Sequence, residues 1–165
     1  MRTKRIAVIA AIVALASLVI GNVAARATGS PAPAGGEITD LYMSDSPDGP
    51  PLPHFLVGPQ VVHIVPVGTD VVYVVLKYTN MEGEQYGIKV SDPFGGILLT
   101  QDISLTGSGT KSFEVRYYED GDPVAFPTGK YVTNLYIGGI GGLPHKDCWW
   151  EVRHMVFLPL ILRNY

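Results

Sequence analysis

The sequence has one cysteine, Cys148, and no stretch beyond its N-terminal segment in which apolar residues recur at helical spacing. An intramolecular disulfide is therefore excluded, and the lone thiol is either buried and inert or used between chains. Its neighbours Trp149 and Trp150 favour burial. The missing helical periodicity predicts a chain built from strands.

A catalytic constellation is also missing. Ser108 lies in TGSGT, which has the composition of a glycine turn and lacks the G-x-S-x-G pattern of a nucleophile elbow. Apolar neighbours of Cys148 would raise its pKa rather than activate its thiol. The histidines stand singly, without the spacing of zinc ligands, at His54, His63, His145 and His154. The sequence therefore predicts a protein that is not an enzyme.

The N-terminal segment has the three parts of a secretory signal peptide. Three basic residues lie in the first five, residues 6–20 are apolar in fourteen of fifteen positions, and Ala25 and Ala27 form a small-x-small site. We predict cleavage after Ala27 and an extracellular or cell-surface location. An uncleaved N-terminal anchor is the alternative, and it is the only membrane contact that the sequence suggests.

Positive charge becomes scarce once residues 1–27 are removed. The remaining 138 residues hold eight Lys and Arg against 15 Asp and Glu, a net charge of −7. Such a chain repels phosphate backbones, so we expect no nucleic-acid partner. Its length fits one domain.

Period-two alternation runs through the chain from Glu37 onward. Tyr86, Ile88 and Val90 alternate with smaller or polar residues, and glycine- or proline-containing turns separate such runs. The expected strands lie near residues 37–44, 60–66, 71–79, 85–91, 97–104, 111–118, 130–138 and 148–158. Seven or eight short strands at this spacing predict an all-β, immunoglobulin-like antiparallel sandwich, with a small jelly-roll or barrel as the alternative.

The domain boundaries follow from composition. Residues 28–36, TGSPAPAGG, read as a linker of Pro, Gly and Ala. The sandwich is expected over residues 37–157, followed by an apolar tail over residues 158–165. Within the sandwich, FPTGKY places Tyr131 directly after a turn, the position of a tyrosine corner, whose hydroxyl bonds upstream backbone. An ordinary half-buried strand tyrosine is the other interpretation.

Three segments resemble one known family. IVPVGTDVVYVVLKYTNMEGEQYGIKVSDPFGG (residues 64–96) and FPTGKYVTNLYIGG (126–139) are similar to an Ig-like module of secreted proteins from green non-sulfur (Chloroflexus-type) bacteria. The ending FLPLILRNY resembles the Leu-Pro-Leu-x-Leu-Arg-Asn tail of exported proteins in that group. The resemblance implies an extracellular sandwich. It implies no ligand and no site residues.

Two candidate ligand sites lie in the expected sandwich. Adjacent Trp149 and Trp150 must point to opposite faces of a strand, so one joins the core and the other faces outward. The outward one, helped by Tyr73 or Tyr136, could stack on a sugar ring, although cover by the tail or a loop is the simpler interpretation. Acidic loop residues are a candidate calcium site, the only cofactor suggested, although Asp-Gly is also a common turn dipeptide; these residues are Glu119, Asp120 and Asp122.

The apolar tail is too short to span a bilayer. Its interaction residues are expected to be Leu158, Pro159, Leu160, Ile161 and Leu162. They either pack on their own domain or serve a partner, such as surface machinery or a neighbouring subunit. We therefore predict an exported structural or adhesive module whose partner is a cell-surface or wall component, a glycan or a neighbouring protein subunit. The alternatives are a carbohydrate-binding module and a self-assembling subunit that uses its C-terminal strand.

Overall fold

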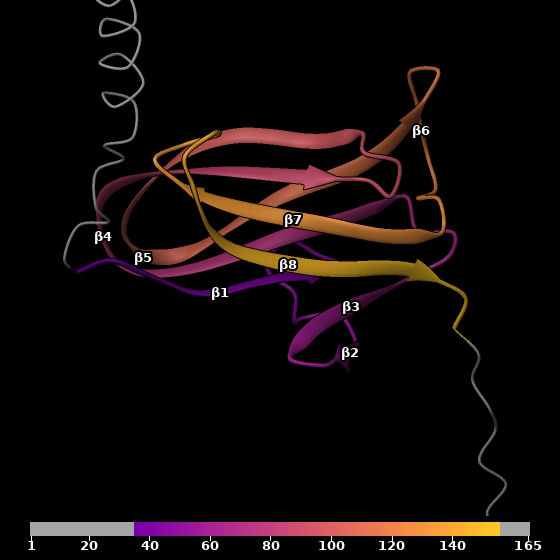
Figure 1. Cartoon of the computed structure of the whole chain (residues 1–165), viewed down its shortest axis with the longest axis horizontal. Coiled ribbons are helices and arrows are strands. Elements are labelled where there is room, and N and C mark those ends of the chain that lie inside the picture. The colour runs from indigo at the N-terminus through magenta and orange to yellow at the C-terminus, as the bar shows by residue number, and fades with distance from the viewer. Residues whose placement is uncertain (1–34, 156–165) are drawn as a thin grey trace, which may run out of the picture. The chain divides into compact units, whose positions relative to one another are not determined.

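The computed structural model describes residues 35–155, and this part of the chain is all-β (Figure 1). The predicted signal peptide, nearly all of the linker and the apolar tail lie outside the described residues. The strands are β1 (Glu37–Ser44), β2 (His54–Val57), β3 (Gln60–Pro66), β4 (Val71–Ser91), β5 (Ile97–Glu119), β6 (Asp122–Val124), β7 (Gly129–Ile137) and β8 (Leu143–Arg153). No helix among the described residues has the length and apolar character to cross a membrane.

The strands form two layers, which confirms the predicted sandwich. One layer holds β1, the first half of β4, the second half of β5 and β6; the other runs β2, β3, β8, β7, the second half of β4 and the first half of β5. Both β4 and β5 pass from one layer to the other, as the bend at one end of Figure 1 shows. The hydrogen-bonded ladder is therefore continuous between the layers.

The bend corrects the predicted strand boundaries. The segments NMEGE (residues 80–84) and TGSGT (residues 106–110) lie between the expected strands 71–79 and 85–91 and the expected strands 97–104 and 111–118, where turns were predicted, but they are bulges inside β4 and β5. Asn80, Gly83 and Gly107 have positive φ angles of 54°, 101° and 71°, and the β4–β5 register shifts between Tyr78 and Met81. A bulge increases local twist and bends a strand, which carries the pair around the corner.

One strand pairing departs from the antiparallel pattern. β3 and β8 run parallel, with Val62 beside Trp149 and Val65 beside Val152. β2, which the sequence did not predict, pairs with β3 on its other side. The last strand also lies five residues earlier than expected, because β8 runs over Leu143–Arg153 rather than near residues 148–158.

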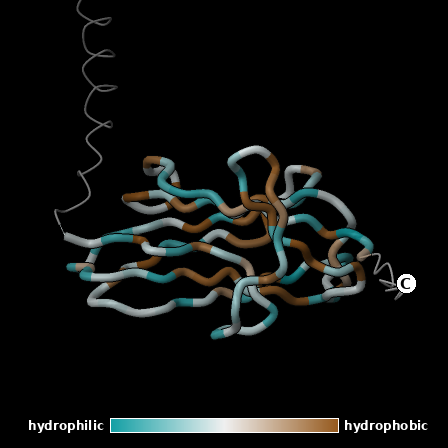
Figure 2. Tube along the Cα trace, turned by 90° about the horizontal axis from the view of Figure 1, so that it is seen from below, coloured by the Kyte–Doolittle hydropathy of each residue, from teal (hydrophilic) through white to brown (hydrophobic). Residues whose placement is uncertain are grey.

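Apolar and polar residues alternate along the strands (Figure 2), and the apolar side chains that point inward form the core between the two layers. The core is centred on three aromatic rings. Tyr131 stacks on Trp150 at a centroid distance of 4.1 Å and an interplanar angle of 16°, and Phe126 meets both rings edge-on. Tyr131 and Trp150 are fully buried. The core therefore has a rigid aromatic centre built from β7, β8 and the loop before β7.

The tyrosine corner is confirmed. The hydroxyl of Tyr131 donates a hydrogen bond of 2.7 Å to the backbone carbonyl of Pro127, four residues upstream. Burial raises the pKa of this hydroxyl well above its usual value, so it remains a donor throughout the neutral range. The bond fixes the loop that leads into β7 against the start of the strand.

Candidate binding surfaces

An apolar row crosses the outer face of the layer that contains β8. The register places Phe55 beside Val62, Val62 beside Trp149, and Trp149 beside Val132, on four adjacent strands. Side chains directly opposite each other in a sheet share a face. Trp150 points into the core, so its neighbour Trp149 and the residues level with it lie on the outer face, where Val62 is only 5% exposed and the other three side chains are half-buried. We call Phe55, Val62, Val132 and Trp149 the apolar band.

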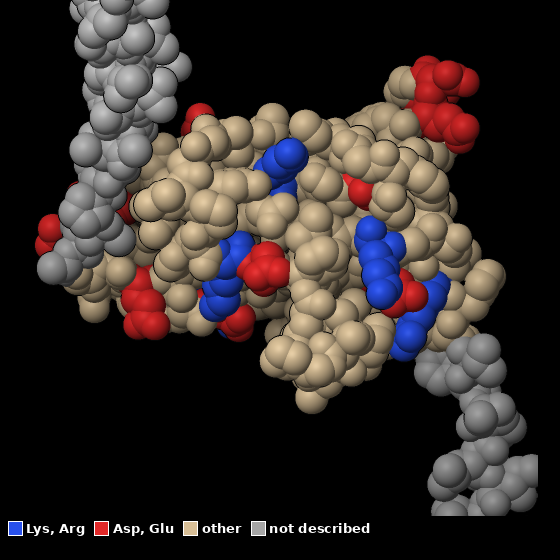
Figure 3. Space-filling model, in the orientation of Figure 1, with Lys and Arg blue, Asp and Glu red and all other residues tan. Residues whose placement is uncertain are grey.

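Charged groups border the apolar band on both sides. Along β8, Asp147 precedes Trp149 and accepts a hydrogen bond from its indole Nε1. Arg153 lies over the ring of Phe55 at 4.3 Å from its centroid, and Lys130 pairs with Glu151 in the register. Figure 3, which shows this side of the molecule, has wide uncharged areas between a few charged clusters. An apolar strip with a charged border is typical of a contact surface.

The candidate ligand residues are only partly brought together. Trp149 is half-buried on the outer face and Trp150 is in the core, as the alternation predicted. Tyr136 shares the outer face with Val132 but lies four residues further along β7, about 13 Å away. Tyr73 is on the other layer, where its hydroxyl donates to Glu114 at 3.4 Å. Tyr73 therefore cannot help Trp149 to stack on one ring.

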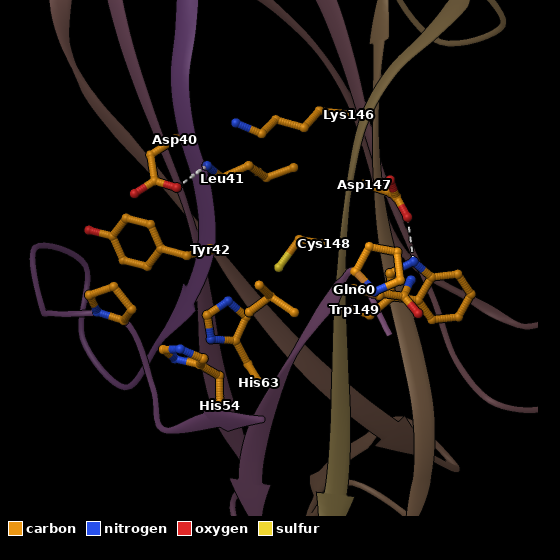
Figure 4. Close-up of a pocket in the computed structure, with 13 residues that line it drawn as sticks. Asp40, Leu41, Tyr42, His54, Gln60, His63, Lys146, Asp147, Cys148 and Trp149 are labelled. Atoms are coloured by element: carbon orange, nitrogen blue, oxygen red, sulfur yellow. Dashed lines mark hydrogen bonds between the residues drawn. The ribbon is translucent and has the colours of Figure 1, made fainter. Parts of the chain in front are cut away.

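A groove of about 570 Å³ opens between β1 and the strands β2, β3 and β8. Figure 4 shows His54, His63 and Cys148 on the side of β1 toward which Leu41 points, whereas the ring of Tyr42, which also lines the groove, lies on the other side of that strand. The two imidazole rings meet edge-on at a centroid distance of 5.8 Å. The groove thus mixes apolar walls with two imidazoles at the open side of the sandwich.

The free edge of β1, beside the groove, is protected against added strands. A register shift between Ile38 and Asp40 interrupts its ladder. The Asp40 carboxylate accepts from the backbone N–H of Leu41 at 2.9 Å, and the backbone N–H of Leu52 donates to the Met43 carbonyl at 2.8 Å. Bulges, inward-turned charges and covering loops all keep an edge from pairing with another chain.

The groove does not activate its thiol or its buried imidazole. Burial raises the pKa of Cys148 to about 12, so the thiol stays protonated at neutral pH. The predicted burial of the cysteine is confirmed. Burial also lowers the pKa of His63 below 6.5, although the bond between its Nδ1 and the Leu52 carbonyl, 3.2 Å, opposes this shift. Neutral His63 donates its Nδ1 proton to that carbonyl.

The lowered pKa of His63 predicts a pH-dependent stability. Because unfolded His63 binds a proton more readily than folded His63, stability is full above the unfolded pKa of 6.5 and is lost as pH falls below it. We expect the free energy of unfolding in urea to drop between about pH 7 and pH 5.5. His63→Gln should flatten this slope, whereas His54→Gln, at an exposed imidazole beside it, should keep it. An equal slope in both variants would contradict the assignment.

The candidate calcium residues lie at the tip between β5 and β6. Acidic side chains gather there in Figure 3, and Asp120 and Gly121 have the positive φ angles of a tight hairpin, 53° and 92°. Among residues 35–155, no group of three or more His, Cys, Asp or Glu side chains is placed to hold a metal ion. Glu119, Asp120 and Asp122 therefore form a turn and are not brought together as a ligand set.

Sequence reasoning missed the apolar band and the groove, because both depend on neighbours distant in the chain. Phe55 and Val62 precede Trp149 by more than 80 positions, and only the parallel pairing of β3 with β8 joins them. One feature of the sequence of β3 could have indicated an apolar outer face. Val62 and Ile64, on the outer face, are as apolar as Val65, on the inner face.

Comparisons with known proteins give a structural likeness and nothing closer. A CARDB domain from Pyrococcus furiosus, solved in complex with di-metal ions, has 13% sequence identity and a TM-score of 0.37. The likeness covers 72% of this chain and 97% of that domain. No protein-family model matches the sequence, and no curated protein matches it.

Proposed function

We propose that this chain is an exported, non-catalytic structural or adhesive module that acts at the cell surface through an outer face of its sandwich. The observation that carries the proposal is the apolar band. The outer face of a sandwich layer is ordinarily polar, yet four adjacent strands contribute an apolar side chain to one row here. Such a row favours contact with another molecule.

The chemistry of the groove supports a non-catalytic role. A thiol nucleophile needs a lowered pKa, whereas burial raises the pKa of Cys148 to about 12. Neutral His63 keeps a free lone pair on Nε2, because its Nδ1 proton is donated to the Leu52 carbonyl, but the thiol in the same groove is not activated for it to act on. These groups fit packing better than catalysis.

Export is supported by the signal architecture of residues 1–27 and by the resemblance to secreted modules. Expression in a bacterium, followed by fractionation and mass spectrometry, tests it. We expect the protein outside the cytoplasm with Thr28 at its N-terminus. A chain that keeps Met1 and stays with the cytoplasmic fraction would contradict the proposal, and one that keeps Met1 in the membrane fraction would indicate an anchored form.

Carbohydrate binding is a second candidate function, favoured by the half-buried Trp149 and by Tyr136 on the same face. Soluble glycans that quench tryptophan fluorescence would favour this candidate. Trp150 is fully buried, so a change on binding would report mainly on Trp149.

A further inference from the structure

We propose that residues 156–165 of one copy bind across the apolar band of a second copy of this chain. Two features of the chain, the apolar band and the apolar C-terminal segment, support this binding. The band is an apolar row with three half-buried side chains on the outer face of a layer, and only two residues separate the sequence VFLPLILRNY from the end of the strand that carries Trp149. Contact between the two would remove from water the apolar surface that remains accessible on each, and such surface favours association. The inference stands whether or not the protein is exported.

The receiving surface has accessible apolar groups at its rim. Val57 lies two residues beyond Phe55 on the same face of β2 and is 48% exposed. Trp149, half-buried, lies in the middle of the row with its indole N–H already bonded to Asp147. An incoming apolar side chain would therefore meet ring and methyl surface without displacing a polar partner.

The dimensions of the two parts agree. Four strands spaced about 4.8 Å apart make the band about 14 Å wide between its outer strands. The five apolar residues 158–162, when extended, span about 13 Å between the first and last Cα atoms. Pro159 suits such a crossing, because a chain that lies across strands needs no donor for a ladder.

Charge also fits. Arg163 is the only charged side chain in residues 156–165, and Asp147 lies directly beside the band. With the apolar residues over the band and Leu162 at its β7 end, Arg163 would lie one strand beyond Asp147, so its long side chain would have to turn back toward β8 to meet this carboxylate. Such an Arg–carboxylate contact would set the direction in which the segment lies.

The geometry indicates that the segment binds a second copy of the chain rather than its own domain. Reaching its own band would require the chain to reverse soon after Arg153, where β8 ends. Before Arg163, the only residue that commonly opens a turn is Pro159. A reversal at Pro159 would return residues 161–165 only to the end of β8, whereas Trp149 lies four residues, about 13 Å, further back.

Binding of this kind is heterologous, since the segment and the band are different surfaces. Each copy would provide one C-terminal segment and one apolar band, so copies would join head to tail into rings or open chains. Association would therefore rise with concentration without stopping at a dimer.

The test compares the whole chain with a chain that ends at Met155, both with the same N-terminus, by sedimentation velocity. We expect the mass of the whole chain to rise with concentration and the shortened chain to stay monomeric. A labelled peptide of residues 156–165 should then bind the shortened chain, measured by fluorescence anisotropy, and a peptide of scrambled sequence should not.

Two matched variants locate the binding surface. Val57→Glu, on the outer face of β2, should weaken peptide binding about tenfold, because it places a charge beside the band. Leu56→Glu changes the neighbouring residue, which is 68% exposed on the opposite face of the same strand, and should leave binding within about twofold. Both positions are exposed, so both variants should fold, which their melting temperatures would show.

Three outcomes would overturn the proposal. The first is a whole chain that stays monomeric at every concentration. The second is a shortened chain that melts earlier with no change in mass, which would place the segment on its own domain. The third is equal weakening of peptide binding by Leu56→Glu and Val57→Glu, which would move the site away from the band.

Discussion

Replacing Trp150 with alanine is expected to lower the free energy of unfolding by about 3–5 kcal/mol, measured by urea denaturation. The side chain is fully buried. Its ring stacks on Tyr131 at 4.1 Å and meets Phe126 edge-on at 5.4 Å. Alanine would remove both aromatic contacts and leave a cavity that the surrounding strands can fill only in part.

The loss should come from packing alone. The indole Nε1 of Trp150 has no hydrogen-bond partner among the described residues, so removing it breaks no hydrogen bond. Its desolvation is a cost that the folded state already carries. Trp150→Phe, which keeps an aromatic ring at the centre, should therefore recover part of the stability lost in Trp150→Ala.

Trp149→Ala is the matched control. This residue is adjacent on the same strand but half-buried on the outer face. We expect it to cost about 1 kcal/mol or less, because the side chain leaves no internal cavity. Equal losses at the two positions would contradict the view that the aromatic centre of the core lies on one side of β8.

The strand alternation and the role of Tyr131 were predictable because both are local. Trp149 and Trp150 had to face opposite ways, and a tyrosine after a proline–glycine turn had an upstream carbonyl within reach. The bend in β4 and β5 was not predictable in the same way. Asn80 and Gly107 have positive φ, and the same residue types signal a hairpin turn or a bulge. Only the partner strand distinguishes the two.

The same distinction between local features and features that depend on distant strands applies to the candidate sites. Period two predicts that one of Trp149 and Trp150 points outward, but which one does so, and which residues lie beside it, depend on the pairing of distant strands. Tyr73 was grouped with it because both are aromatic, yet the bend places the first half of β4 in the other layer. The acidic loop was proposed as a calcium site from its composition. In the structure this loop is a tight turn, in which Asp120 and Gly121 have positive φ.

The tyrosine corner gives the second large effect. Tyr131→Phe should lower the free energy of unfolding in urea by about 1–3 kcal/mol, because it leaves the Pro127 carbonyl without its donor while the ring stays in place. The stacking on Trp150 should survive, so the loss measures the hydrogen bond rather than the core. Tyr136→Phe, on the outer face of the same strand, is the control and should change stability by less than about 0.5 kcal/mol. If Tyr131→Phe cost no more than Tyr136→Phe, the bond to Pro127 would be a consequence of the fold and not a cause of its stability.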